Sequence, residues 1–268
     1  MNAHDHPGIR YLQAAGNRPE LARVLEGYAG NLPLCVQADR AKFEQRKDLG
    51  ERRYQRADQK PRFYFPHLSA RPWHPDSPWV KVLEAAFGAI RDEFAAVERQ
   101  VRDHPQTYLV LDGKWSLFTL FRDGRKWEEN CALCPETTRV VESLPICDRG
   151  GGVVYFSIMD PGTRIKAHCG LTNSRIRHHL GIEVPAGVRL TVAGETCSWE
   201  EGRCLAFDDS FVHEVRHEGD RRRVVLIVDT WHPELTRAEA EFAGEVQRLF
   251  HGSMQPAAAA TRAPARAG

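Results

Sequence analysis

The sequence predicts a mainly β protein whose core is a double-stranded β-helix, or jelly roll, flanked by N-terminal and C-terminal helices. Three observations favour this fold. From about residue 107 to residue 231 the chain consists of short segments with the two-residue apolar period of strands, separated by turn residues. Residues 79–102 have a helical apolar period instead, and residues 233–250 read as a closing helix. Many short strands at this spacing are typical of a sandwich or barrel.

Each predicted element rests on its own pattern. The helix over residues 79–102 has apolar side chains at a 3.6-residue spacing, namely Val80, Val82, Leu83, Phe87, Ile90, Phe94 and Val97. Strands are expected at residues 108–111, 115–121, 153–159, 164–168, 175–184, 188–192, 203–207, 213–217 and 222–231, with a further helix at 136–144.

The chain divides into three parts by composition. Residues 1–60 are polar and are expected to form a helical or linker extension, with one short amphipathic helix around residues 21–25 and a charged stretch at 41–53. Residues 61–250 are expected to form the jelly-roll domain, which opens with an extended, proline-punctuated stretch at 62–73. Residues 251–268 are rich in Ala, Pro and Arg, which predicts a disordered tail.

Composition excludes several classes of function. The formal net charge is +1, so no overall field points to nucleic acid or to a membrane surface. No apolar run approaches the roughly 18 residues of a spanning helix, and the N-terminus lacks the pattern of a signal peptide. Seven cysteines, an odd number, favour reduced thiols and a cytoplasmic location. The oligomeric state is left open.

The strand at residues 175–184 carries polar side chains on one face. Arg175, Arg177 and His179 alternate with apolar residues, so they share one side of the sheet. This pattern fits either an outer strand with one face in water or a barrel whose polar interior holds a charged ligand. Arg223 opens a strand with apolar residues on both faces, and a buried arginine there needs an anionic partner. The second interpretation is therefore favoured.

Two histidines lie at strand ends beside small or turn residues. His168 and His213 leave room for a metal, and neutral imidazole suits iron, zinc, copper or nickel. A facial triad of two histidines and one carboxylate often reads His-x-Asp, but here the third position is Gly170. Asp208 or Asp209 could supply the carboxylate, although both are expected to shape the turn before His213.

Several ordered motifs resemble one known family. They include residues 64–66 (YFP), 70–73 (ARPW), 115–120 (WSLFTL), 157–163 (SIMDPGT), 199–202 (WEEG), 207–211 (FDDSF), 231–235 (WHPEL) and the run His168-x-Gly170-x-Thr172-Asn173-x-Arg175-x-Arg177-x-His179. From about residue 64 to 235 the chain resembles the aspartyl/asparaginyl β-hydroxylases in a short, bacterial-type form. These are 2-oxoglutarate-dependent Fe(II) oxygenases.

The resemblance implies a role for each candidate residue. His168 and His213 become the iron ligands, since this family has a glycine where its relatives have a carboxylate. Arg223 becomes the partner of the distal carboxylate of 2-oxoglutarate, and Arg175 a residue that holds a substrate carboxylate. Further contacts to 2-oxoglutarate are implied for Trp115, Ser157, Arg177 and His179. Arginine suits both carboxylates because it binds them in a bidentate, charge-assisted way.

The implied reaction is hydroxylation of an unactivated carbon, expected to be β to a carboxyl group, in an Asp- or Asn-like residue. Dioxygen is consumed, and 2-oxoglutarate yields succinate and CO2. Two alternatives use the same centre: halogenation, with a halide in the position that Gly170 leaves open, and a cupin-like zinc hydrolase or isomerase. A third is a catalytically silent metal-binding module. The presence of both histidines and of Arg223 argues against the third.

The substrate is a small molecule, a peptide or a carrier-tethered amino acid in the first instance, with a protein or a lipid acyl chain as further candidates. Family members that act on folded domains carry a lysine two residues before the position of Ser157, where this chain has Tyr155. Their longer forms also have a helical repeat array, for which residues 1–60 are too short.

Cys131 and Cys134 occupy a loop in which the family can form a disulfide, and they are expected to be ordinary thiols.

Overall fold

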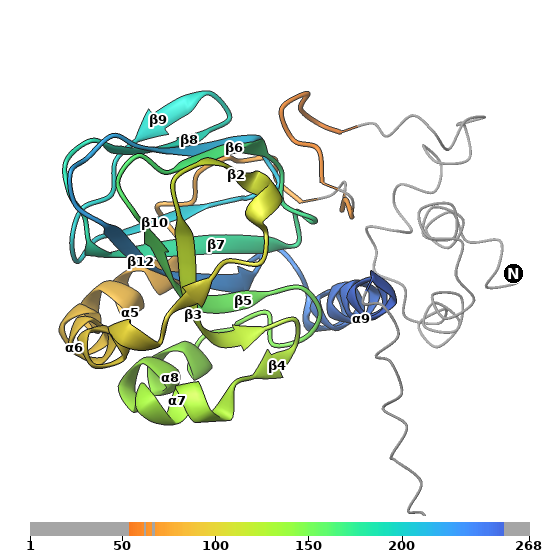
Figure 1. Cartoon of the computed structure of the whole chain (residues 1–268). Coiled ribbons are helices and arrows are strands. Elements are labelled where there is room, and N and C mark those ends of the chain that lie inside the picture. The colour runs from red at the N-terminus through yellow and green to blue at the C-terminus, as the bar shows by residue number, and fades with distance from the viewer. Residues whose placement is uncertain (1–53, 62, 66–67, 255–268) are drawn as a thin grey trace, which may run out of the picture.

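The computed structural model describes residues 54–61, 63–65 and 68–254 (Figure 1). Two antiparallel sheets dominate this part of the chain. The large sheet has the order β1-β3-β5-β12-β7-β10, with β4 paired to β3, and the small sheet has the order β2-β6-β11-β8-β9. The expectation of a mainly β protein is confirmed.

The strands of the large sheet are β1 (Arg102–Asp103), β3 (Trp115–Arg122), β4 (Arg125–Lys126), β5 (Val153–Met159), β7 (Arg175–Glu183), β10 (Cys204–Phe207) and β12 (Arg223–Trp231). Those of the small sheet are β2 (Val110–Asp112), β6 (Arg164–His168), β8 (Val188–Val192), β9 (Glu195–Cys197) and β11 (His213–His217). The helices are α5 (Pro78–Ala85), α6 (Phe87–Val97), α7 (Glu128–Leu133), α8 (Pro135–Glu142) and α9 (Arg237–Met254), with short 3-10 turns η2 (Glu98–Gln100) and η3 (Thr107–Leu109).

From β5 to β12 the chain alternates between the two sheets. β5, β7, β10 and β12 belong to the large sheet, while β6, β8, β9 and β11 belong to the small one. Strands far apart in sequence therefore pair, as β12 does with both β5 and β7. This winding is that of a double-stranded β-helix, so the predicted jelly-roll core is confirmed.

Each face of the large sheet has its own apolar cluster. The outer face is covered by α5, α6 and α8 (Figure 1), and there Phe94 of α6 meets Phe156 of β5 with ring centroids 5.0 Å apart. The inner face meets the small sheet through a second cluster that includes Leu190, Phe207 and Val225. Period-2 geometry divides each strand between the two clusters. In β7, Ile176, Leu180 and Ile182 pack under the helices, so the alternate side chains face the space between the sheets.

The structure differs from the sequence prediction at several boundaries. The helix predicted over residues 79–102 is two helices, because Ala86 leaves the helical conformation. Both segments bury apolar residues on the same sheet, so the apolar period crosses the break and conceals it. The strands β1, β4 and β9 and the six-residue helix α7 are too short to show a period, and the prediction missed them.

The two ends of the domain also differ from expectation. The closing helix α9 starts at Arg237 and includes residues 251–254, which were assigned to the tail. Residues assigned to the N-terminal extension lie against the loop before β11, where the carbonyl of Asp58 accepts a hydrogen bond from the Val212 N–H at 2.7 Å. The expected helix near residues 21–25 and the charged stretch at 41–53 lie outside the described residues. No described helix is both long enough and apolar enough to cross a membrane.

Candidate functional site: a polar cavity between the two sheets

A cavity of about 480 Å³ lies between the sheets. Strands of the large sheet line one side of it, and β6 and β11 of the small sheet line the other. Every residue predicted to belong to the site reaches this one cavity: Trp115, Ser157, His168, Arg175, Arg177, His179, His213 and Arg223. The polar interior favoured by the alternation of residues 175–184 is therefore present.

The two histidines face each other across a strand pair. β11 runs antiparallel to β6, with His213 directly opposite His168 and the ring centroids 4.1 Å apart. The Nδ1 of His168 lies 2.8 Å from the Lys166 carbonyl, and that of His213 lies 2.9 Å from the Phe211 carbonyl. Because a carbonyl only accepts, each Nδ1 is the donor and each Nε2 keeps a free lone pair.

Burial keeps both imidazoles neutral. It lowers the pKa of His168, and burial together with the neighbouring His168 ring lowers the pKa of His213 to about 3. A neutral ring with a free Nε2 lone pair is the form that binds a metal. Within the described part of the chain, no cluster of three or more His, Cys, Asp or Glu side chains could hold a metal ion. The candidate metal centre is therefore the histidine pair.

Gly170 leaves the space that the Asp209 carboxylate fills. A Cβ built on Gly170 would lie 2.4–2.5 Å from the carboxylate atoms of Asp209, and the Gly170 N–H donates to the Asp209 carbonyl at 2.6 Å. Any larger residue at position 170 would have to displace that carboxylate. Position 170 itself supplies no carboxylate. The Asp209 carboxylate reaches the same region from the loop before β11.

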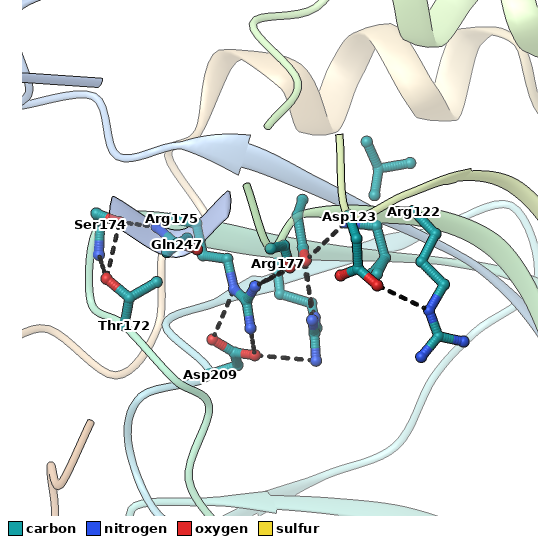
Figure 2. A network of polar contacts seen from close by, with 12 residues as sticks. Arg122, Asp123, Thr172, Ser174, Arg175, Arg177, Asp209 and Gln247 are labelled. Carbon is teal, nitrogen blue, oxygen red and sulfur yellow. Dashed lines mark hydrogen bonds and ion pairs between the residues drawn. The ribbon is translucent and has the colours of Figure 1, made fainter. Parts of the chain in front are cut away.

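Arg175, Arg177 and Asp209, which line the cavity and are labelled in Figure 2, form a buried ion-pair network together with Asp229. Asp209 bridges Arg175 and Arg177, with nitrogen–oxygen distances of 2.9 Å to each. Asp229 on β12 takes a bidentate contact from Arg177 at 2.8 and 2.9 Å, and lies 3.5 Å from Arg175. The four charges balance, which offsets the cost of burying them.

Arg223 differs from those arginines because no described carboxylate pairs with it. Its Nη1 donates to the hydroxyl and the carbonyl of Ser157, both at 3.2 Å, and its guanidinium lies 4.9 Å from the Trp199 ring centroid. The Nε is buried and has no hydrogen-bond partner among the described residues, and burial lowers the pKa of Arg223 to about 9. A buried cation of this kind is costly unless an anion joins it.

The remaining predicted residues surround Arg223. The Trp115 indole N–H donates to the Ser157 hydroxyl at 2.9 Å, so Ser157 connects Trp115 to Arg223. His179 stacks on Trp199 with ring centroids 5.9 Å apart, and no residue in the described part of the chain hydrogen-bonds to either of its ring nitrogens. Unpaired polar groups beside an unpaired cation indicate a pocket shaped for a polar, anionic molecule.

Comparison with known proteins agrees with the motifs. The family profile described as Aspartyl/Asparaginyl beta-hydroxylase matches residues 84–233. The chain belongs to the aspartyl/asparaginyl β-hydroxylase family. Among its relatives, rat aspartate beta-hydroxylase domain-containing protein 2 is 41% identical over 68% of this chain and 57% of its own length. Human aspartyl/asparaginyl beta-hydroxylase is 41% identical over 63% of this chain and 24% of its own.

The chain thus spans about half the length of the first of these relatives and about a quarter of the length of the second. Among solved structures, a prolyl-4-hydroxylase from Pseudomonas putida is 12% identical, with a TM-score of 0.37 over 61% of this chain and 94% of that one.

The structure gives different roles to Asp208 and Asp209, which were both expected to shape the turn before His213. Asp208 does so, since its side chain accepts from the Ser210 N–H at 2.9 Å and from Gln59 at 3.0 Å. For Asp209 the expectation is wrong, because its carboxylate points to Gly170 and the two arginines. The requirement that buried arginines have anionic partners signals that such carboxylates exist, but it does not select Asp209 or Asp229 from the sequence.

The structure also bears on the predictions for Arg175 and for the two cysteines Cys131 and Cys134. Arg175, predicted to hold a substrate carboxylate, already donates to Asp209 and, at 2.6 Å, to the Gly151 carbonyl. Such a role stays a prediction, and it would require Arg175 to give up one of these contacts. Cys131 lies on α7 rather than in a loop, and Cys134 follows that helix; both are buried free thiols. Burial raises the pKa of both, which makes them unreactive.

Proposed function

We propose that this protein is a 2-oxoglutarate- and Fe(II)-dependent dioxygenase that hydroxylates an unactivated carbon of an Asp- or Asn-like residue. The substrate is an amino acid, a peptide or a protein residue, and the hydroxylated carbon is the one β to a carboxyl group. The observation that carries the proposal is one cavity with a histidine pair on one side and an unpaired buried arginine on the other.

The residues present fit a metal ion with two protein ligands. The Nε2 atoms of His168 and His213 are free to coordinate, because each Nδ1 is used by a carbonyl. Imidazole nitrogen is a ligand that Fe(II) accepts, and two protein ligands leave several coordination positions for exogenous groups. The Asp209 carboxylate beside Gly170 is held by two arginines, so it supplies negative charge near the metal position and accepts hydrogen bonds there.

The opposite wall fits a small dicarboxylate. Arg223 offers a buried guanidinium without a carboxylate partner, Ser157 offers a hydroxyl, and His179 offers ring nitrogens. A five-carbon keto diacid would pair its distal carboxylate with Arg223 and direct its keto-acid end toward the histidines. Charge-assisted, bidentate contacts of this kind are among the strongest that a protein makes.

When bound, iron with 2-oxoglutarate and dioxygen supplies the oxidising power for C–H cleavage, with release of succinate and CO2. The chain contributes orientation and exclusion of water. Arg175 and Arg177 fix the Asp209 carboxylate, and the apolar walls of the cavity, such as Leu190 and Phe207, keep bulk water away. The Asp209 carboxylate fills the space beside Gly170 and is negatively charged, which disfavours a halide there and favours hydroxylation over halogenation.

The test is product analysis. We expect the protein with Fe(II), 2-oxoglutarate and air to release succinate in the presence of Asp- or Asn-containing amino acids or peptides, together with a product 16 Da heavier. The reaction is repeated with added chloride. Substrate-dependent succinate with a chlorinated product would favour halogenation, and no substrate-dependent succinate across the panel would contradict the proposal. His217→Asn is a control, since His217 lies on β11 but does not line the cavity.

A further inference from the structure

A β-bulge turns one arginine of β3 into the cavity. The pairing of β3 with β5 shifts between Thr119, opposite Tyr155, and Phe121, opposite Val154. Leu120 and Phe121 both pack on the helix-covered face of the sheet as a result. Arg122 then lies opposite Val153 and lines the cavity. Without the extra residue, strict alternation would place Arg122 on the face of Phe118 and Leu120, under the helices.

Arg122 has donor capacity that no described residue uses. Its Nε contacts the Asp123 carboxylate at 3.3 Å, and no described acceptor meets its two terminal nitrogens. Its side chain is 31% exposed, at the cavity and its opening to solvent. In Figure 2 its guanidinium extends to the same side of the strands as those of Arg175 and Arg177. Those two arginines pair with buried aspartates at 2.8–2.9 Å, whereas Arg122 has one longer contact through Nε to the partly exposed Asp123, which leaves its two terminal nitrogens available.

Two neutral donors lie near Arg122. The Tyr155 hydroxyl has no described hydrogen-bond partner, although the residue is 5% exposed and lines the cavity. The His104 ring lies 5.7 Å from the Tyr155 ring and stacks on Trp115 at 3.5 Å, centroid to centroid. Its Nδ1 accepts from the Gln106 N–H, so the proton of the neutral ring is on Nε2, which also faces no described acceptor.

The charge of Arg122 acts on His104. Burial, and then the charges of Arg122 and Arg177, lower the pKa of His104 to about 3, which keeps this ring a neutral donor at physiological pH. A guanidinium, a phenol and an imidazole N–H are all donors, and an acceptor-rich anion satisfies all three. Asp123 occupies only the Nε edge of Arg122, so the edge with the two terminal nitrogens is left for a ligand.

We propose that Arg122, Tyr155 and His104 form an anion subsite that binds a carboxylate or phosphate group of the substrate, apart from the arginine that serves 2-oxoglutarate. This assignment rests on the proposed function and narrows its substrate class to molecules that carry an acidic group near the reacting carbon. It also gives the β3 bulge a role, since the bulge is what turns Arg122 toward the bound molecule.

The test is calorimetric titration of the full chain loaded with Fe(II) and 2-oxoglutarate without oxygen, so that nothing turns over. The probes are N-acetyl-aspartate α-amide, its uncharged counterpart N-acetyl-asparagine α-amide, and N-acetyl-phosphoserine α-amide. We expect one of the two acidic probes to bind at least about tenfold more tightly than the asparagine probe, the value of one charge-assisted contact. The identity of the tighter acidic probe distinguishes a carboxylate from a phosphate.

Variants assign the preference to the subsite. Arg122→Gln should remove the preference for the tighter acidic probe over the asparagine probe, and Arg122→Lys should retain part of that preference. Tyr155→Phe should weaken the binding of the acidic probe several-fold. Arg125→Gln is the matched control, because Arg125 lies on the same hairpin, is exposed and does not line the cavity. Its preference should equal that of the unaltered protein. Thermal melting of each variant checks folding.

Several results would overturn the subsite: equal or undetectable binding of all three probes, a preference that survives Arg122→Gln, or one that Arg125→Gln removes as well. The proposed function is tested separately, by the visible absorption band of the iron–2-oxoglutarate chelate, to which Arg122 does not contribute. If that band is absent, the titration is repeated on the iron-free protein, since the subsite includes no metal ligand. The two failures are thereby distinguishable.

Discussion

Replacing Arg223 with methionine is expected to weaken 2-oxoglutarate binding by about 2–5 kcal/mol, which is roughly thirtyfold to several thousandfold in the dissociation constant. The reason is that Arg223 is the buried cation for which the structure provides no carboxylate. The ligand-free variant should be as stable as the unaltered protein or more so, because methionine fills similar space without a buried charge. Calorimetry with 2-oxoglutarate and thermal melting without it measure the two effects.

The neighbouring arginine provides the control for this prediction. Arg222 lies at the same end of the strand but pairs with Glu98 and Glu183, and its side chain is 38% exposed. Arg222→Met should cost about 1 kcal/mol of stability or less and leave 2-oxoglutarate binding unchanged. The assigned role of Arg223 would be wrong if both variants bound 2-oxoglutarate equally well.

Asp209→Asn is expected to destabilise the protein by about 3–5 kcal/mol. Asp209 is 1% exposed and bridges two buried arginines, so the amide would remove the shared anion and leave uncompensated positive charge. Although burial raises it, Arg175 and Arg177 hold the pKa of this carboxyl well below its usual range. A depressed pKa stabilises the fold above the unfolded value of about 4 and loses that contribution as pH falls, so the effect is full at neutral pH. Chemical denaturation at pH 7 measures it.

The adjacent aspartate provides a matched comparison. Asp208 is equally buried but pairs with no described arginine, and burial raises its pKa to about 7. Asp208→Asn therefore replaces a carboxyl that is readily neutral, and rotation of the Gln59 amide can restore its hydrogen bond. We expect a cost of about 1 kcal/mol. Equal costs for the two variants would contradict the distinction between a turn residue and a residue of the ion-pair network.

The fold was predictable where the chain repeats a period. The alternation in β7 predicted a polar face, and the structure directs Arg175, Arg177 and His179 to the cavity. The break at Ala86 was not predictable, since α5 and α6 bury one continuous apolar pattern. The β3 bulge was not predictable either. One extra residue in a strand does not change the strand-like composition, and the bulge is visible only in the pairing of β3 with β5.

The site was predictable to a similar degree. The histidines and Arg223 were singled out because a metal ligand and a buried cation impose requirements on single residues; the structure places all three at one cavity, and their roles stay predictions. Their partners were not, since Asp209 comes from a loop without a period and Asp229 reaches Arg177 only after β12 pairs with β7. A single sequence says which charges need neutralising but not which segment supplies the opposite charge.

The most direct test of the central claim, a two-histidine iron centre that binds 2-oxoglutarate, is the visible charge-transfer band of the chelate under anaerobic conditions. Fe(II) and 2-oxoglutarate added together should produce the band in the unaltered protein and in His217→Asn, whereas His213→Ala should produce none. A missing band in the unaltered protein, or a full band in His213→Ala, would contradict the claim.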